Sequence, residues 1–240
     1  MQALIFDCDG VLVDTERDGH RVAFNQAFSK AGLDVSWNVN VYGELLKIAG
    51  GKERMRHYFE SAGWPAGAAS DKDAFLAELH KTKTAIFADL INRGQLPLRP
   101  GVLRLVDEAV NAGVRLGVCT TSNPKSIDAV LDLMGPERKA KFEFVLAGDI
   151  VSRKKPDPEI YELALAKLGI PAGECIVVED SRNGLLAATG AGLPCFVTTS
   201  TYTAEEDFSE AVGIAAELGD PPDRTVSLKE LSSLAEQAFA

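Results

Sequence analysis

The stretch Ala3-Leu4-Ile5-Phe6-Asp7-Cys8-Asp9-Gly10-Val11 indicates both the fold of this chain and the place of its chemistry. Residues 3–6 form a continuous apolar run, which is typical of a strand buried on both faces of a parallel sheet. Two carboxylates, Asp7 and Asp9, follow it one residue apart. Open parallel sheets bind ligands beyond the carboxyl ends of their strands, so this pair is a candidate reactive site. Because like charges this close repel, each needs a partner such as a metal ion.

Asp7 and Asp9 suit two complementary roles in phosphoryl transfer. Asp7 would be a carboxylate nucleophile that forms an aspartyl-phosphate, and Asp9 a proton donor and acceptor beside it. The alternative is a surface turn, because Asp and Gly are common turn residues. The rest of the chain decides between these interpretations.

Further apolar runs repeat the first one, with helical segments between them, at residues 115–119, 144–147, 175–178 and 195–197. One intervening helix is expected to start at Asn123-Pro124 and to stop at Gly135. A second is expected to start at Asp157-Pro158 and to stop at Gly169. This alternation predicts an α/β fold with a doubly wound, Rossmann-like parallel sheet.

One stretch breaks the alternation. More than a hundred residues separate the first two apolar runs, whereas a normal crossover needs only about a dozen. Residues 15–31 and 75–91 read as helices, so we expect an inserted all-helical cap domain at 15–98 and an α/β core at 1–14 and 99–240. Both joints adjoin the Asp7 and Asp9 site, and hinge motion there would open and close a lid. A last helix is expected at 228–239.

Composition describes an ordinary soluble globule and limits its partners. The chain has 240 residues, 46% of them hydrophobic, and a net charge of −10, which argues against nucleic acid and anionic membranes. No apolar stretch approaches the roughly 20 residues of a membrane-spanning helix, and we expect no signal peptide before the first strand. The cysteines lack metal-ligand spacing and are expected to be buried thiols in a reducing compartment, at Cys8, Cys119, Cys175 and Cys195.

Three further apolar runs lead to groups that suit a phosphate or a metal ion. Thr120-Thr121-Ser122 precede a helix N-terminus, where hydroxyl and N–H groups bind phosphate, although simple N-capping is the alternative. Lys155, fixed by Pro156, offers a point charge for phosphate, with a solvated surface lysine as the alternative. Glu179-Asp180 form a second carboxylate pair, and carboxylate oxygens are ligands that Mg²⁺ prefers.

In this order, each after an apolar strand, these motifs resemble the haloacid dehalogenase superfamily of phosphohydrolases over essentially the whole chain. The insertion is similar to the small helical cap of that superfamily. The resemblance implies a five-stranded parallel core with the first strand in the centre. The residues that match its four motifs in turn are Asp7, Asp9, Gly10 and Asp14, then Thr120, then Lys155, then Glu179 and Asp180.

The resemblance also implies a role for each core residue. Asp7 attacks phosphorus and binds Mg²⁺ with the Asp9 backbone carbonyl and the Asp180 side chain. Divalent charge allows Asp7 to remain ionised beside a phosphate. Asp9 protonates the leaving oxygen and then deprotonates water. Glu179 is expected to partner Lys155 or metal-bound water, and the phosphate-binding groups are those of Thr120, Thr121, Ser122 and Lys155.

The cap sequence is similar to that of the CbbY proteins, through residues 14–20, 42–46, 50–54, 58–59, 63–65 and 98–101. That family hydrolyses xylulose-1,5-bisphosphate, an inhibitor of RuBisCO, to xylulose-5-phosphate and phosphate. The cap ligands that the resemblance implies are Glu16, His20, Tyr42, Gly51, Lys52 and Arg54. Lys52 and Arg54 would hold the second phosphate; the alternative for this segment is a Gly-Gly turn with solvated charges.

We therefore expect a Mg²⁺-dependent sugar-bisphosphate phosphatase. The alternatives are a phosphomutase of the β-phosphoglucomutase type, a phosphatase for another small sugar phosphate, and a catalytically dead phosphosugar sensor. The presence of Asp7 and Asp9 disfavours the last of these. We expect a monomer that binds a small phosphorylated sugar and neither nucleic acid nor membrane, in a plastid (chloroplast) stroma or alternatively a bacterial cytoplasm.

Overall fold

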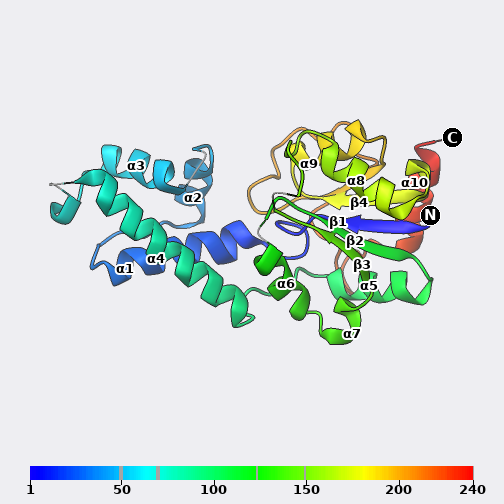
Figure 1. Ribbon diagram of the computed structural model, residues 1–240, viewed down its shortest axis with the longest axis horizontal. Helices are drawn as coiled ribbons and strands as arrows, with labels where there is room; N and C mark the ends of the chain where they lie inside the picture. The colour runs from blue at the N-terminus through cyan, green and yellow to red at the C-terminus, as the bar shows by residue number, and fades with distance from the viewer. Residues whose placement is uncertain (49–50, 69–70, 123, 149, 240) are drawn as a thin grey trace. The chain divides into compact units, whose positions relative to one another are not determined.

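The computed structural model describes residues 1–48, 51–68, 71–122, 124–148 and 150–239 (Figure 1). The chain divides into two compact units. One contains Met1–Asp14 and Leu96–Ala240, and the other contains Thr15–Gln95.

A six-stranded parallel sheet forms the centre of the first unit, with the order β3-β2-β1-β4-β5-β6. β1 lies between β2 and β4, with Phe6 in register with Val118 on one side and Val178 on the other. The strand order reverses between β1 and β4, which is where open sheets of this kind bind ligands. The strands are β1 Ala3–Phe6, β2 Arg115–Cys119, β3 Phe142–Leu146, β4 Cys175–Glu179, β5 Cys195–Thr198 and β6 Gly213–Ala215.

The doubly wound parallel sheet that the sequence predicts is confirmed, but the predicted number of strands is wrong. The structure adds β6 at the edge of the sheet beyond β5. β6 has three residues, and its Ile214 is 51% exposed. β6 lies within the apolar run 211–216. That run consists mainly of glycine and alanine, which are depleted in strands, so its strand signal is weak.

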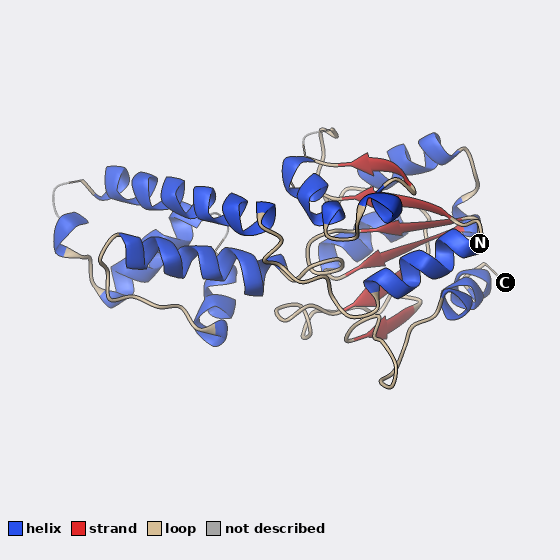
Figure 2. Cartoon of the chain, turned by 90° about the horizontal axis from the view of Figure 1, so that it is seen from below, coloured by secondary structure: helices blue, strands red, loops and turns tan. Residues whose placement is uncertain are grey.

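Helices pack on both faces of this sheet (Figure 2). The stop signal at Gly169 is confirmed, since Gly169 caps its helix in the left-handed conformation at φ +64°. The helix expected to stop at Gly135 ends earlier, at Asp132, and Gly135 precedes the next short helix. The predicted start at Asn123 lies outside the described residues. The helices are α5 Val102–Asn111, α6 Pro124–Asp132, α7 Pro136–Lys139, α8 Glu159–Leu168, α9 Arg182–Gly190 and α10 Leu228–Gln237, with a 3₁₀ turn at Ala172–Glu174.

The second unit is helical around an aromatic core. Trp37 and Tyr42 are fully buried there with Phe24, Phe28 and Phe59. The expected helix at 15–31 begins as a π-helical segment before α1, and α4 starts where the Asp71 side chain accepts from the Ala74 N–H at 2.9 Å. The elements are the π-helical Thr15–His20, α1 Arg21–Lys30, α2 Val39–Leu46, α3 Gly51–Ala62, a 3₁₀ turn at Ala66–Ala68, and α4 Lys72–Asn92.

The thiols agree with the prediction, because all four cysteines are buried and free. Among the described residues, no helix combines the length and the apolar character that crossing a bilayer requires.

Candidate active site

Lys155 joins the ends of three strands in the α/β unit. Its ammonium lies 2.6 Å from Asp7 Oδ1, just beyond β1, and 2.6 Å from Glu179 Oε1, at the end of β4. It also donates to the carbonyl of Cys119, the last residue of β2, at 2.9 Å. The Lys155 side chain is only 8% exposed. Residues far apart in the sequence therefore meet at one edge of the sheet, and Lys155 is not the solvated surface lysine of the alternative.

Glu179 is occupied by hydrogen bonds from several sides. Besides Lys155, Oε1 accepts from the Tyr161 hydroxyl at 2.5 Å, and Oε2 accepts from the Asp180 N–H at 3.2 Å. The helix after β4 approaches so closely that a Cβ on Gly184 would lie 1.9 Å from Oε2. Glu179 is therefore a partner of Lys155. Tyr161 was not predicted from the sequence, because a tyrosine on the apolar face of α8 reads as core.

The buried carboxylates of this site need positive charge. Asp7, Glu179 and Asp180 each place an oxygen within 4.8 Å of the others. Burial raises the pKa of Asp7, and the neighbouring carboxylates add to this while Lys155 opposes it. Burial together with Glu179 raises the pKa of Asp180 to about 8. One ammonium among these acids leaves a surplus of negative charge, so this set of hard oxygen donors fits a divalent cation such as Mg²⁺.

Gly10 shows how closely the β1 loop approaches Asp180. Its backbone has φ +79°, and a Cβ there would lie 1.9 Å from Asp180 Oδ2. The preceding residue, Asp9, is predicted to use its backbone carbonyl as a metal ligand, and this stays a prediction. Only glycine fits this turn beside the carboxylate.

The segment after β2 contacts the second carboxylate of the β1 loop directly. The Ser122 hydroxyl hydrogen-bonds Asp9 Oδ2, and the Ser122 N–H donates to Thr120 Oγ1 at 3.2 Å. Thr120 is buried, whereas Thr121 is exposed. The predicted phosphate-binding segment thus lies beside Asp9, at the start of α6.

Asp14, the last residue of the first motif, bonds to the loop after β5. Its Oδ2 accepts from the Thr201 hydroxyl at 2.6 Å and from the Thr201 N–H at 3.4 Å. Asp14 is 7% exposed. Its position indicates a structural rather than a chemical part in the site.

In the helical unit, the predicted ligands Glu16, Tyr42 and Arg54 form one hydrogen-bonded group. The Tyr42 hydroxyl donates to Glu16 Oε2 at 2.6 Å, and Arg54 Nη1 donates to the same hydroxyl at 2.8 Å. Arg54 is held in addition by the Leu45 carbonyl, 3.0 Å from Nε, and is 9% exposed.

His20 pairs with Lys83, a residue of α4 that the sequence did not single out. The Lys83 ammonium lies 2.9 Å from His20 Nδ1 and 4.8 Å from the centre of the Phe24 ring. Burial lowers the pKa of Lys83 to about 8, although Glu16 opposes the shift. Burial and the Lys83 charge also lower the pKa of His20. Lys83 was missed because a lysine within a long charged helix reads as part of a solvated face.

Gly51 and Lys52 begin α3 beside this group. A Cβ on Gly51 would lie 2.8 Å from the His80 ring. Lys52 is exposed, and its charge contributes to lowering the pKa of His80. The adjoining residues 49–50 lie outside the described part of the chain.

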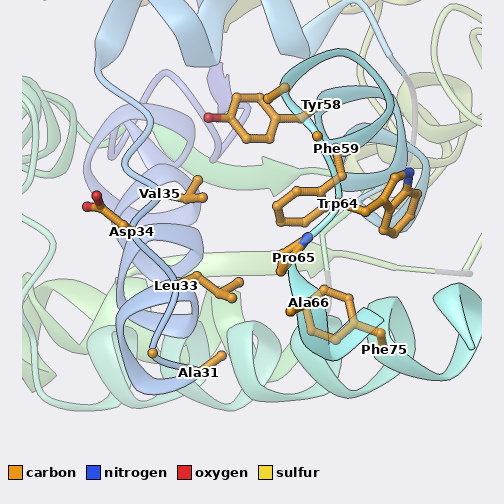
Figure 3. Close-up of a pocket in the computed structure, with 13 residues that line it drawn as sticks. Ala31, Leu33, Asp34, Val35, Tyr58, Phe59, Trp64, Pro65, Ala66 and Phe75 are labelled. Atoms are coloured by element: carbon orange, nitrogen blue, oxygen red, sulfur yellow. The ribbon is translucent and has the colours of Figure 1, made fainter. Parts of the chain in front are cut away.

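The helical unit also has a pocket of about 660 Å³ (Figure 3). Tyr58, Phe59, Trp64 and Phe75 line one side, and Leu33 and Val35 lie opposite them. The predicted cap ligands are not among the residues that line it, so the charged group around His20 and Tyr42 is a separate feature.

Comparison with known proteins identifies the family. Residues 1–192 match the haloacid dehalogenase-like hydrolases. A CBBY-like protein of Arabidopsis thaliana is 52% identical over 241 residues, which cover 99% of this chain and 75% of the relative. The plasmid-encoded CbbY protein of Cupriavidus necator is 42% identical over 224 residues, 93% of this chain and 88% of that protein. This chain is a CbbY-type haloacid dehalogenase-like hydrolase.

A solved CbbY structure agrees with this assignment. The crystal structure of a CbbY mutant from Rhodobacter sphaeroides in complex with xylulose-(1,5)bisphosphate has a TM-score of 0.73 and 37% identity. It covers 96% of this chain, which in turn covers 99% of that chain. The predicted superfamily, the Rossmann-like fold and the phosphatase class of this CbbY-type chain are confirmed. CbbY-type relatives occur in a plant and in bacteria.

Proposed function

We propose that this CbbY-type chain is a Mg²⁺-dependent phosphatase that hydrolyses xylulose-1,5-bisphosphate to xylulose-5-phosphate and phosphate. The observation that carries the proposal is the buried Asp7 carboxylate at the end of β1, paired at 2.6 Å with Lys155 beside Glu179 and Asp180. The bisphosphate in the R. sphaeroides CbbY crystal supports the choice of substrate. Removal of such an inhibitor of RuBisCO would be the biological role.

The core residues provide a two-step reaction. A carboxylate oxygen of Asp7 attacks phosphorus, a P–O bond to Asp7 forms, and the bond to the sugar oxygen breaks while Asp9 gives that oxygen its proton. Asp9 then takes a proton from water, which attacks the aspartyl-phosphate and releases phosphate with Asp7 restored. Ser122 orients Asp9 through its hydrogen bond. Lys155 and Thr120 would stabilise the negative charge on the transferring group.

Asp7 and Asp180 would hold the Mg²⁺ ion, together with the Asp9 backbone carbonyl. Bound Mg²⁺ would neutralise charge at the phosphate, which lets two anions approach. Glu179 is left out of this ligand set because its oxygens already serve Lys155, Tyr161 and the Asp180 N–H.

The helical unit, proposed as the cap at 15–98, would choose the substrate. Among the described residues, no ion pair joins Arg54 to a carboxylate, and the Lys83 ammonium contacts His20 Nδ1, with the Glu16 charge near enough to raise the pKa of Lys83. Cations kept this way are free to meet an added anion. We propose that Lys52 and Arg54 bind the second phosphate, that Glu16 accepts a sugar hydroxyl, and that His20, Tyr42 and Gly51 complete the pocket.

Product analysis tests the proposal directly. Phosphate release is to be measured on a panel of C5 and C6 sugar mono- and bisphosphates, with and without Mg²⁺. We expect release from xylulose-1,5-bisphosphate above all others, and only with the metal. An isomerised monophosphate without phosphate release would instead identify a phosphomutase, and a preferred monophosphate would identify another small sugar phosphatase.

Replacement of Lys52 tests the second-phosphate site. Lys52→Ala should lower kcat/KM for a sugar bisphosphate at least tenfold and leave an aryl monophosphate nearly unchanged, because only the bisphosphate has the second anion. Lys72→Ala is the matched control, since Lys72 is an exposed lysine of the same unit that stacks on Trp64 at 4.5 Å. Equal losses on both substrates, or none, contradict this assignment.

A plastid stroma is the proposed location, with a bacterial cytoplasm as the alternative. Immunodetection of the chain in fractionated cells of its source organism tests this part of the proposal.

A further inference from the structure

Arg99 places its guanidinium among four backbone carbonyls of the α/β unit. It donates to Thr198 O at 3.5 Å and to Thr199 O at 2.8 Å, both at the end of β5, and to Ala216 O at 2.6 Å, just beyond β6. Its fourth acceptor is the carbonyl of Gly10 in the β1 loop. Arg99 therefore ties the loop that follows β1 to the segments that follow β5 and β6.

The loop that Arg99 holds is a tight turn that carries Asp9. The Leu12 N–H donates to Cys8 O at 2.9 Å, and the Gly10 N–H donates to Val13 O at 2.7 Å. The Arg99 N–H adds a bond to the Leu12 carbonyl at 2.8 Å. Displacement of Gly10 would shift the adjoining residue Asp9 and alter the close approach of Gly10 to Asp180. The position of Asp9 thus depends on what holds the Gly10 carbonyl.

We propose that Arg99 is a positioning residue for the proton transfer by Asp9, an inference that rests on the proposed function. Its planar fork of donors suits several carbonyls at once, whereas a lysine ammonium is a single point charge. Without the guanidinium, the Gly10 carbonyl loses its donor. The Asp9 carboxylate can then move away from the position in which it donates a proton to the leaving-group oxygen. A displacement of about 1 Å costs up to a hundredfold in rate.

Arg104 provides a matched control in the same unit. It also donates to backbone carbonyls, those of Leu218, Gly219 and Val226, at 2.7–3.2 Å. These carbonyls lie outside the loops that carry Asp7, Asp9, Lys155 and Asp180. Arg104 also pairs with the carboxylates of Glu108 at 2.7 Å and Asp220 at 3.5 Å. Arg99→Ala and Arg104→Ala thus both remove donors to backbone carbonyls, but only the first releases the turn around Asp9.

The test measures kcat/KM on a series of aryl phosphates and an alkyl phosphate, since this constant reports the steps up to leaving-group departure. A poor leaving group needs the proton from Asp9, and a good one does not. We expect Arg99→Ala to lower kcat/KM tenfold to a hundredfold for the alkyl phosphate, and less than threefold for the aryl phosphate whose phenol is most acidic. Asp9→Asn should give the same pattern, and Arg99→Lys an intermediate one. Arg104→Ala should lower kcat/KM only slightly, and by the same factor for all esters.

Hydrogen exchange provides a second readout that does not depend on activity. Arg99→Ala should exchange the amides of residues 10–13 at least tenfold faster, whereas Arg104→Ala should leave them as in the native chain. The proposal fails if Arg99→Ala loses activity uniformly over the series, or if these amides keep their protection. If the native chain hydrolyses no phosphate ester, the proposed function fails, and the proposed role for Arg99 in proton transfer fails with it.

Discussion

At the scale of single residues, two buried lysines have ammonium groups in opposite electrostatic environments. Lys155 is held by two carboxylates at 2.6 Å, which raise its pKa against the effect of burial. Lys83 lies against aromatic rings and a histidine, and burial lowers its pKa. The first arrangement keeps a permanent charge in the core. The second leaves a cation whose charge is costly until an anion arrives.

Replacement of Asp7, the proposed nucleophile, should separate activity from stability. Burial raises the pKa of Asp7, so its negative charge lowers native-state stability at every pH above the ordinary value near 3.8. Asp7→Asn should therefore abolish turnover and still raise the melting temperature at pH 7 in metal-free buffer. The gain should disappear as the pH falls towards that ordinary value. A lower melting temperature for the variant at pH 7 would contradict this reading of the charge.

Lys83→Met should likewise stabilise the free protein. Below pH 8 the native state holds a buried ammonium at a cost. Between about pH 8 and the ordinary 10.5 the native state releases the proton first, so native stability rises with pH. The variant should gain a few kcal/mol at pH 7, and this gain should shrink over that interval.

Chemical denaturation at several pH values measures the effect of Lys83→Met. Lys81→Met is its control, because the Lys81 side chain is 80% exposed on the same helix. An equal gain from both variants would show that burial of the charge is not the cause.

At the scale of elements, strand ends and helix starts hold the site together. α9 illustrates this, since it begins after the Ser181 side chain accepts from the Gly184 N–H at 3.2 Å. That cap turns the helix so that Gly184 faces Glu179. A side chain has no room there, so the first turn of this helix is fitted to the site.

Substitution of the two glycines of α9 tests that fit. Gly184→Ala would place a Cβ 1.9 Å from Glu179 Oε2, whereas Gly190→Ala would meet only Pro158, at 3.4 Å. Alanine favours a helix over glycine by about 1 kcal/mol, so the second variant should be neutral or slightly more stable. The first should displace Glu179 from Lys155 and lose at least tenfold in kcat, with a melting temperature several degrees lower. Equal behaviour of the two variants in both assays would refute the fit.

The elements also show which signals a sequence carries. β1 and β4 were predictable because a short run of consecutive apolar residues is typical of a strand buried on both faces of a parallel sheet. β3 begins at Phe142, two residues before the predicted start at 144, because Glu143 is half exposed and paired with Arg115 at 2.5 Å. A charged residue interrupts the apolar run from which the start of the strand is predicted.

At the scale of the whole molecule, the predictable part of the site is the part built on strand ends. Asp7, Lys155 and Glu179 converge because parallel strands bring their carboxyl ends to one edge, and the motif order fixes which residues meet. The contacts of Tyr161 and Arg99 in the α/β unit, and of Lys83 in the helical unit, were not predicted. Their contacts depend on side-chain packing across elements, which periodicity and spacing do not report.

Metal binding should stabilise the whole chain by an amount that rises with the logarithm of the Mg²⁺ concentration above its dissociation constant. Mg²⁺ at a hundred times its dissociation constant would add about 2.7 kcal/mol, or roughly 5–10 °C in melting temperature for a chain of this size. Differential scanning fluorimetry with Mg²⁺ and with a chelator measures this shift. Asp180→Asn should reduce it strongly; an undiminished shift would place the ion elsewhere.

The place of β1 in the sheet has a consequence for biosynthesis. The strands that pair with β1 begin at Arg115 and Cys175. Most of the polypeptide must therefore be synthesised before β1 can pair on both sides. Until then the apolar segment that precedes Asp7 stays exposed to non-native association, as in other long-range pairings. The residues of the helical insertion are contiguous, so it can fold as soon as they have been synthesised. Nascent chains halted before residue 175 should therefore depend on chaperones for the α/β unit and not for the helical unit.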